Sequence, residues 1–219
     1  MTLTKPILKG NKLLLRPLTK SDATAMFASL PPASQRLTGT HTRHSFADVQ
    51  AHCIRIEEAT DRWDYGIVVD GQLVGEVVLN DIDWSNRSSS FRIAIWDPVE
   101  RDKGYGTEAT SLLVAFGFRE LGLNRIELEV YAFNPQAQKA YEKVGFRLEG
   151  IKREALLWGT ERVAAHLMGL LRSEYSGMAG RGTRLIEEVA RHRPARELRT
   201  LTRENTPEPG IRICVTASP

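Results

Sequence analysis

The feature that most constrains this chain is a glycine-bearing turn between a strand-like run and a helical segment. The run Phe91–Trp96 precedes the turn Arg101–Glu108, and helical spacing begins at Ala109. Gly104 and Gly106 permit positive φ angles and leave no Cβ to keep a ligand from the main chain. Successive N–H groups in such a turn, together with a helix N-terminus, attract anions. The sequence therefore predicts a cradle for a phosphate or a diphosphate.

Other segments narrow the choice of phosphate ligand. The turn lacks both the Gly-x-x-x-x-Gly-Lys-Ser/Thr pattern of nucleotide hydrolases and the three-glycine dinucleotide fingerprint. It has instead the pattern Arg/Gln-x-x-Gly-x-Gly/Ala. Farther along, Arg125–Tyr131 alternates like a strand. A second helical segment then has the pattern Asn-x-x-Ala-x-x-x-Tyr-x-x-x-Gly-Phe, formed by Asn134, Ala137, Tyr141, Gly145 and Phe146.

These patterns, in this order and spacing, resemble the GNAT acetyltransferase superfamily. The resemblance covers roughly residues 10 to 175 and is strongest to the branch that acetylates ribosomal-protein N-termini and small amines. It implies an α/β fold with a single mixed, mostly antiparallel twisted sheet flanked by helices. It also implies acetyl-CoA as cofactor and N-acetyltransferase activity.

Local signals along the chain agree with an α/β domain. Lys12–Leu18 reads as a strand, and Asp70–Gly71 between two apolar runs indicates a tight hairpin. Ser45 with Asp48 resembles a capping box. It precedes an apolar helical stripe of Phe46, Val49, Cys53 and Ile56. The order of strand meander, helix, strand, helix and two final strands predicts helices on a mixed sheet.

Composition limits the class of protein. Hydrophobic residues make up 42% of the chain and charged residues 26%, as in an ordinary globular protein. No apolar run approaches the ~18 residues of a membrane span, and no signal-peptide core is visible at Met1. Cys53 and Cys214 lie far apart, which argues against a disulfide framework and predicts a cytoplasmic protein.

The basic charge is concentrated in the last part of the chain. Residues 178–219 contain eight Arg and five Glu with no Lys or Asp, and this net charge of +3 equals that of the whole chain. A neutral body argues against nucleic acid as the main ligand. We expect an acetyltransferase domain over residues 1–177 and a basic C-terminal extension over 178–219, partly ordered or disordered. Packing or homodimer contact, disorder, and a partner-binding arm all remain open for it.

The resemblance also assigns roles to residues. The turn should bind the diphosphate of acetyl-CoA through the following positions: Arg101, Asp102, Lys103, Gly104, Tyr105, Gly106 and Thr107. A backbone N–H near Ile95 or Trp96 should serve the thioester carbonyl. Asn134 should contact the pantetheine arm, and Tyr141 should donate to the departing thiolate. Asn134 and Tyr141 are our candidate catalytic residues. Structural alternatives are a plain helix cap for Asn134, a core aromatic for Tyr141, and solvated charges for Arg101 and Lys103.

The general base is less well defined. Superfamily members often carry a glutamate on the strand before the cradle, but Phe91–Ala94 contains no acid. Substitutes by strand location are Glu76, Asp81, Asp83, Glu127 and Glu129, although each is better explained as a solvent-facing strand residue. Asp81 and Asp83 could instead attract a cationic amine. His166 is better explained as a core histidine, and His41, His44 and His52 lack metal-ligand spacing, so no metal site is expected.

These observations lead to one main functional hypothesis. It is direct attack of a primary amine on acetyl-CoA, with a peptide or protein α-amine slightly favoured over a small amine. The acceptor cleft should be lined by three loops: Pro31–His44, Asp81–Ser88 and Trp158–Glu161. The main alternative is a non-catalytic acyl-CoA sensor or interaction protein, supported by the missing glutamate. A nucleic-acid binder acting through the basic extension is a third hypothesis.

Overall fold

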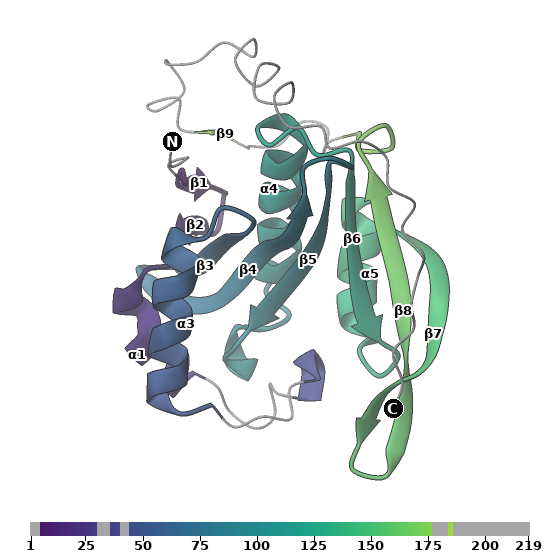
Figure 1. Ribbon diagram of the computed structural model, residues 1–219, viewed down its shortest axis with the longest axis horizontal. Helices are drawn as coiled ribbons and strands as arrows, with labels where there is room; N and C mark the ends of the chain where they lie inside the picture. Colours follow the sequence, from purple (N-terminus) through teal and green to yellow (C-terminus); the bar gives the residue numbers. More distant parts are fainter. Residues whose placement is uncertain (1–4, 30–35, 40–43, 177–183, 186–219) are drawn as a thin grey trace, which may run out of the picture. The chain divides into compact units, whose positions relative to one another are not determined.

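One sheet organises the part of the chain that is described. The computed structural model describes residues 5–29, 36–39, 44–176 and 184–185. Within these ranges nine strands form one sheet in the order β7-β8-β6-β5-β4-β3-β2-β1-β9 (Figure 1). β5 and β6 pair in parallel, and the other described strand pairs are antiparallel. The predicted mixed, mostly antiparallel sheet is confirmed.

The first half of the chain builds one side of the sheet and the helices in front of it. Its strands are β1 (Leu8–Lys9), β2 (Leu14–Pro17), β3 (Trp63–Val69), β4 (Gln72–Asp83) and β5 (Ser88–Ile95). Its described helices are η1 (Lys20–Asp22), α1 (Ala23–Ala28), α3 (Phe46–Glu58) and η2 (Pro98–Glu100). Asp70 and Gly71 turn β3 into β4 with φ angles of 48° and 80°, as the predicted hairpin requires.

The second half supplies the helices behind the sheet and its other side. It contains α4 (Tyr105–Arg119), β6 (Arg125–Tyr131), α5 (Pro135–Val144), β7 (Arg147–Trp158), β8 (Glu161–Leu171) and β9 (Arg184–Leu185). The expected strand and helix at Arg125–Tyr131 and Pro135–Val144 are present with those bounds. The sequence indicates a strand from Phe146 to Arg153. In the structure β7 extends to Trp158, because it continues to pair with β8 after an irregularity in register.

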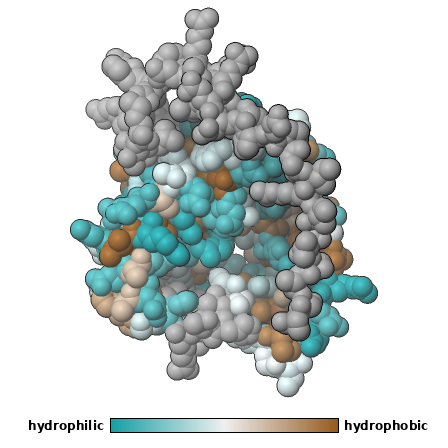
Figure 2. Space-filling view, viewed as in Figure 1, coloured by the Kyte–Doolittle hydropathy of each residue, from teal (hydrophilic) through white to brown (hydrophobic). Residues whose placement is uncertain are grey.

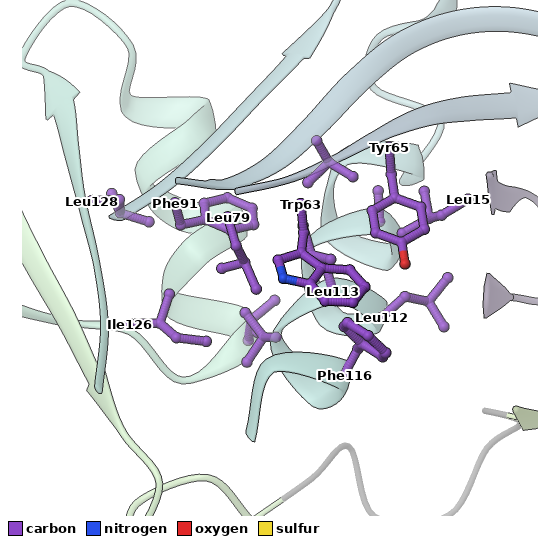
Figure 3. Packing of buried hydrophobic residues seen from close by; sticks show 14 of the residues in the cluster. Leu15, Trp63, Tyr65, Leu79, Phe91, Leu112, Leu113, Phe116, Ile126 and Leu128 are labelled. Carbon is purple, nitrogen blue, oxygen red and sulfur yellow. The ribbon is translucent and has the colours of Figure 1, made fainter. Parts of the chain in front are cut away.

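Two cores lie on opposite faces of the sheet. The larger packs α4 and α5 against the strands and includes Trp63, Tyr65, Phe91, Phe116 and Ile126 (Figure 3). The smaller packs α1 and α3 against the other face and includes Met26, Cys53 and Trp96, among others. Alternate side chains of a strand therefore point to opposite faces of the sheet, and α1 and α3 cover the second face only over strands of the first half of the chain.

The start of α3 shows one confirmed prediction and one wrong one. Ser45 accepts from the Asp48 N–H and donates its own N–H to Asp48, which confirms the capping box. Val49, Cys53 and Ile56 are buried as expected. Phe46, however, is 41% exposed and lies edge-on to Phe27. As the first residue of the helix, it packs against α1 instead of entering the core.

The C-terminal extension lies outside the described residues except for β9. By backbone contacts the chain divides into Met1–Ile186 and Glu187–Pro219, and the second unit is not described. The expected boundary at residue 177 therefore stays a prediction. No helix in the described ranges is long and apolar enough to cross a membrane.

Candidate active site

The site begins where two parallel strands separate. β5 and β6 pair at only three positions, Ser88–Ser90 with Arg125–Glu127, and beyond these they diverge (Figure 1). A cleft of about 1160 Å³ opens between them and is lined by both strands, the 101–107 turn and the start of α5. The face that carries α3 is mostly hydrophilic and is hollowed near its centre (Figure 2). The separation of two strands thus creates the hollow in which ligands can meet.

Alternation along the strands gives the cleft two different sides. Phe91, Leu128 and Val130 belong to the core beneath α4 and α5, with Ile93 and Ile95 packed against it. Arg92 and Ala94 therefore point to the opposite side, as do Glu127, Glu129 and Tyr131 on β6. One side of the cleft is apolar and adjoins the turn, and the other is polar and charged.

The open edge of β5 presents backbone groups to the cleft. The Trp96 N–H donates to the Val74 carbonyl at 3.0 Å, toward β4. Alternate residues of an antiparallel ladder direct their N–H groups to opposite sides, so the Ile95 N–H points away from β4, toward the cleft. Of the two residues expected near a thioester carbonyl, Ile95 lines the cleft, whereas the Trp96 side chain is buried in the smaller core.

The turn has the geometry of an anion cradle. Asp102 and Gly104 have φ angles of 60° and 87°, and Gly104 is the N-cap of α4. The first helical hydrogen bond of α4 runs from the Glu108 N–H to the Gly104 carbonyl at 3.1 Å. The N–H groups of the preceding residues, Tyr105 to Thr107, therefore lack an intrahelical partner. A Cβ on Gly106, which lines the cleft, would meet no atom within 4 Å and would project into open space.

The expected residues of the turn fall into two groups. Those that line the cleft are Arg101, Asp102, Gly104, Gly106 and Thr107. Tyr105 instead packs against the larger core, and Lys103 pairs with Glu100 at 3.0 Å. The Arg101 guanidinium donates to the Ile95 carbonyl at 3.1 Å. It therefore connects the turn to the end of β5.

Asn134 and Tyr141 lie on α5 and both line the cleft. The Asn134 side chain accepts from the Ala137 N–H at 3.2 Å, so it caps the helix as well. Tyr141 is 8% exposed and its ring lies edge-on to Phe91, 6.1 Å away. Burial raises the pKa of its phenol to about 12, which keeps the hydroxyl protonated at neutral pH. The helix-capping amide of Asn134 and the protonated phenol of Tyr141, two helical turns apart, therefore line the same wall of the cleft.

The charged side of the cleft separates the candidate bases. Asp81, Glu127 and Glu129 line it, whereas Glu76 and Asp83 do not. Asp83 accepts from Asn86 in the β4–β5 turn. His166 also lies outside the lining residues and bonds to Gln138 at 2.8 Å.

Glu76 is half-buried on the α3 side of the sheet, and its Oε2 atom is fully buried. Its Oε2 has no hydrogen-bond partner among the described residues, and burial raises the pKa of its carboxyl group.

Arg92 is a cleft residue that the sequence did not single out. Extending the β5–β6 register by two residues places Arg92 opposite Glu129. No ion pair joins them, because the strands have already separated, and Glu129 contacts Lys152 at 3.3 Å instead. Glu127 pairs with Arg125 at 2.9 Å. A residue opposite the carboxylates can be identified only once the pairing of β5 with β6 is known.

Only part of the expected acceptor loops can be placed. In the first loop, residues 31–35 and 40–43 lie outside the described residues, but Leu37 and Thr38 line the cleft. Arg36 lies over the Phe133 ring at 4.9 Å and contacts Glu161 at 3.5 Å. The loop at 158–161 thus touches the first loop without lining the cleft, and from the loop at 81–88 Asp81 lines it.

Comparison with known proteins agrees with this geometry. A family model described as an acetyltransferase (GNAT) domain matches residues 12–147. A probable N-acetyltransferase of Bacillus subtilis, YjcK, is 30% identical over 179 residues, which cover 74% of this chain and 97% of YjcK. The spermidine N(1)-acetyltransferase of Vibrio cholerae is 32% identical over 111 residues, covering 50% of this chain and 64% of that protein.

Solved structures share the fold. A spermidine N-acetyltransferase from Vibrio cholerae, crystallised with CoA and spermine, superposes with a TM-score of 0.71. It is 24% identical and the match covers 76% of this chain and 99% of the other. The protein is therefore an acetyl-CoA-dependent N-acetyltransferase, and the chain belongs to the GNAT acetyltransferase family.

Proposed function

We propose that this protein transfers an acetyl group from acetyl-CoA to the primary amine of a positively charged small molecule, by direct attack of the amine. The observation that carries this proposal is the two-sided cleft. Main-chain donors of the cradle lie at one side, and the carboxylates of Asp81, Glu127 and Glu129 lie at the other. An anionic carrier and a cationic acceptor can therefore meet between β5 and β6.

The apolar side suits the cofactor. The unpaired N–H groups at the start of α4 and the helix dipole favour a diphosphate there. We propose that the Ile95 N–H serves the thioester carbonyl, as an oxyanion donor would. Asn134 would contact the pantetheine arm while it caps α5. When bound, acetyl-CoA supplies the acetyl thioester, and these residues orient it.

The charged side suits the acceptor. An alkylamine has a pKa of about 10 and arrives protonated at neutral pH. We propose that Glu129 receives its proton, directly or through a water, because it lines the cleft just beyond the point where β5 and β6 separate. Asp81 would hold further positive charge, whereas Glu127 already pairs with Arg125. The Tyr141 hydroxyl, held protonated by burial, would donate to the departing thiolate.

The structure supports a different class of acceptor from the one that the sequence favours. Resemblance alone slightly favoured a peptide α-amine. Asp81, Glu127 and Glu129 are among the carboxylates that line the cleft and support a small amine with more than one positive charge. Relatives named as spermidine acetyltransferases point the same way. We further propose that residues 1–177 form the catalytic domain and act in the cytoplasm. A chain ending at Gly177 should keep its turnover, and loss of turnover would contradict that boundary.

The experiment is a turnover assay with matched acceptors. Release of free thiol from acetyl-CoA would be followed with three acceptors. They are spermidine, an alkyl monoamine that carries no other charged group, and a short peptide with a free α-amine. We expect the highest kcat/KM with spermidine and a smaller value with the monoamine. A higher value with the peptide would contradict the small-amine proposal. CoA binding without thiol release on any acceptor would favour the sensor.

A further inference from the structure

A lysine far from the turn in sequence reaches the cradle. Lys12 lies between β1 and β2, yet its Nζ donates to the Lys103 carbonyl at 3.0 Å. The same Nζ is 3.5 Å from the position that a Cβ on Gly104 would occupy. An ammonium group thus lies beside the N-cap of α4, where the unpaired main-chain donors begin.

Glu108 fixes this lysine in place. Its carboxylate accepts from the N–H of Lys12 at 3.1 Å and from the N–H of Asn11. Gly10 allows this, because a Cβ there would overlap the Glu108 side chain. These hydrogen bonds hold the β1–β2 turn against the first turn of α4, and they fix the position of the Lys12 backbone.

The cations near the cradle differ in how far their charge is compensated. Lys103 pairs with Glu100 at 3.0 Å, and this contact raises the pKa of Lys103. Lys12 donates to a neutral carbonyl, and no carboxylate of the described residues lies within 4.0 Å of its Nζ. The Glu108 carboxylate bonds to main-chain amides and not to the Lys12 Nζ, so the ammonium group is available to an anion.

We propose that Lys12 is a binding residue for the diphosphate of acetyl-CoA, supplied by the β1–β2 turn from outside the glycine motif. This inference rests on the proposed function. The diphosphate is favoured over the 3′-phosphate because Gly104 marks the point where the main-chain donors of α4 converge. Lys103, although part of the motif, contributes less because Glu100 already neutralises it.

The test is calorimetric titration of the full chain with CoA and with dephospho-CoA. The variants are Lys12→Met, Lys103→Met and, as a control at an exposed residue of β1, Lys9→Met. We expect Lys12→Met to weaken CoA binding about fivefold, as loss of one charge-assisted contact would. The loss should shrink when the salt concentration rises from about 0.05 M to about 0.5 M. Lys103→Met should cost less than about twofold, and Lys9→Met should bind as the wild type does.

The comparison of CoA with dephospho-CoA distinguishes the two phosphate sites of the cofactor. Equal loss with CoA and dephospho-CoA supports the diphosphate, whereas a loss confined to CoA assigns Lys12 to the 3′-phosphate and overturns the inference. Wild-type affinity in Lys12→Met, or a larger loss in Lys103→Met, also overturns it. Lys12→Arg should retain most of the affinity, and thermal unfolding of each free variant verifies its fold. Absence of CoA binding by the wild type would instead remove the proposed function itself.

Discussion

Strand β6 lies between β8 and β5, and it pairs with β8 over a greater length than with β5. Along β8 it pairs at seven positions, from Arg125 to Tyr131, but along β5 it pairs at three. The fully paired side has its backbone groups satisfied within the sheet and serves as scaffold. The partly paired side leaves the edge of β5 exposed to the cleft, where a ligand can take the place of a strand. The same sheet thus provides rigidity on one side of β6 and binding capacity on the other.

The largest effect is expected where the cleft meets the turn. Gly106→Val would add a branched side chain at the turn, at a position where a Cβ would meet no protein atom within 4 Å. We expect CoA affinity to fall by about a hundredfold or more, the equivalent of losing several charge-assisted contacts. The stability of the free protein should change little. Calorimetry with CoA measures the loss, Gly106→Ala should be intermediate, and undiminished affinity would remove the cradle from the account.

Tyr141 tests the apolar wall of the cleft. Tyr141→Phe keeps the ring against Phe91 and Phe146 but removes the hydroxyl. We expect kcat to fall about tenfold to a hundredfold, within the range for general acid catalysis, with CoA affinity unchanged. Because the phenol has a pKa of about 12, activity near pH 8 should not depend on its ionisation. Steady-state kinetics beside CoA titration provide the measurement, and an unaltered kcat would reassign Tyr141 to core packing.

Glu129 tests the charged wall. Glu129→Gln should lower kcat/KM for spermidine about fivefold to tenfold, because one charge attraction and one proton acceptor are lost. The loss for an alkyl monoamine that carries no other charged group should be smaller. Glu142→Gln is the matched control, since Glu142 is exposed on α5 and bonds to Gln138. Equal kinetics in the Glu129 and Glu142 variants would mean that the acceptor is bound elsewhere.

Glu76 tests the scaffold, away from the cleft, through the pH dependence of stability. Its folded-state pKa is raised because burial disfavours the carboxylate. Its contribution to stability is therefore fully present below the unfolded pKa and is lost as pH rises through the folded pKa. Glu76→Gln should remove this loss and stabilise the protein by about 1 kcal/mol at pH 8. Denaturant unfolding at pH 5 and pH 8 would measure it, and a variant that is less stable than wild type at pH 8 would contradict the account.

Asp64→Asn is the matched control for that experiment. Asp64 is also buried, but it pairs with Arg62 at 2.6 Å. Removal of its charge should destabilise the protein, because Arg62 would lose its partner. Opposite signs for the two variants would show that pairing, and not burial alone, decides the effect.

Local signals in the sequence predicted much of this molecule. The Ser45–Asp48 box, the Asp70–Gly71 hairpin and the Asn134–Pro135 helix start depend on neighbouring residues, so pattern alone sufficed. The sequence did not predict the exposure of Phe46, the full length of β7 or the buried, unpartnered Oε2 of Glu76. These depend on contacts with residues far along the chain.

The candidate site divides in the same way. The glycine turn, Asn134 and Tyr141 lie within short motifs and could be selected in advance. Arg92 and Lys12 could not, because their places follow from the β5–β6 register and from the Glu108 contact. Among the expected bases, spacing could not separate Asp81, Glu127 and Glu129 from Glu76 and Asp83. Only the pairing of the strands shows which carboxylates face the cleft.

The central claim is that main-chain amides of the turn and of the open β5 edge hold the cofactor. Amide hydrogen exchange of the full chain, with and without CoA, tests it most directly. The account predicts new protection at Tyr105, Gly106, Thr107 and Ile95, with no change along the paired β6–β8 strands. Saturation with CoA that leaves these four amides exchanging as before would contradict it.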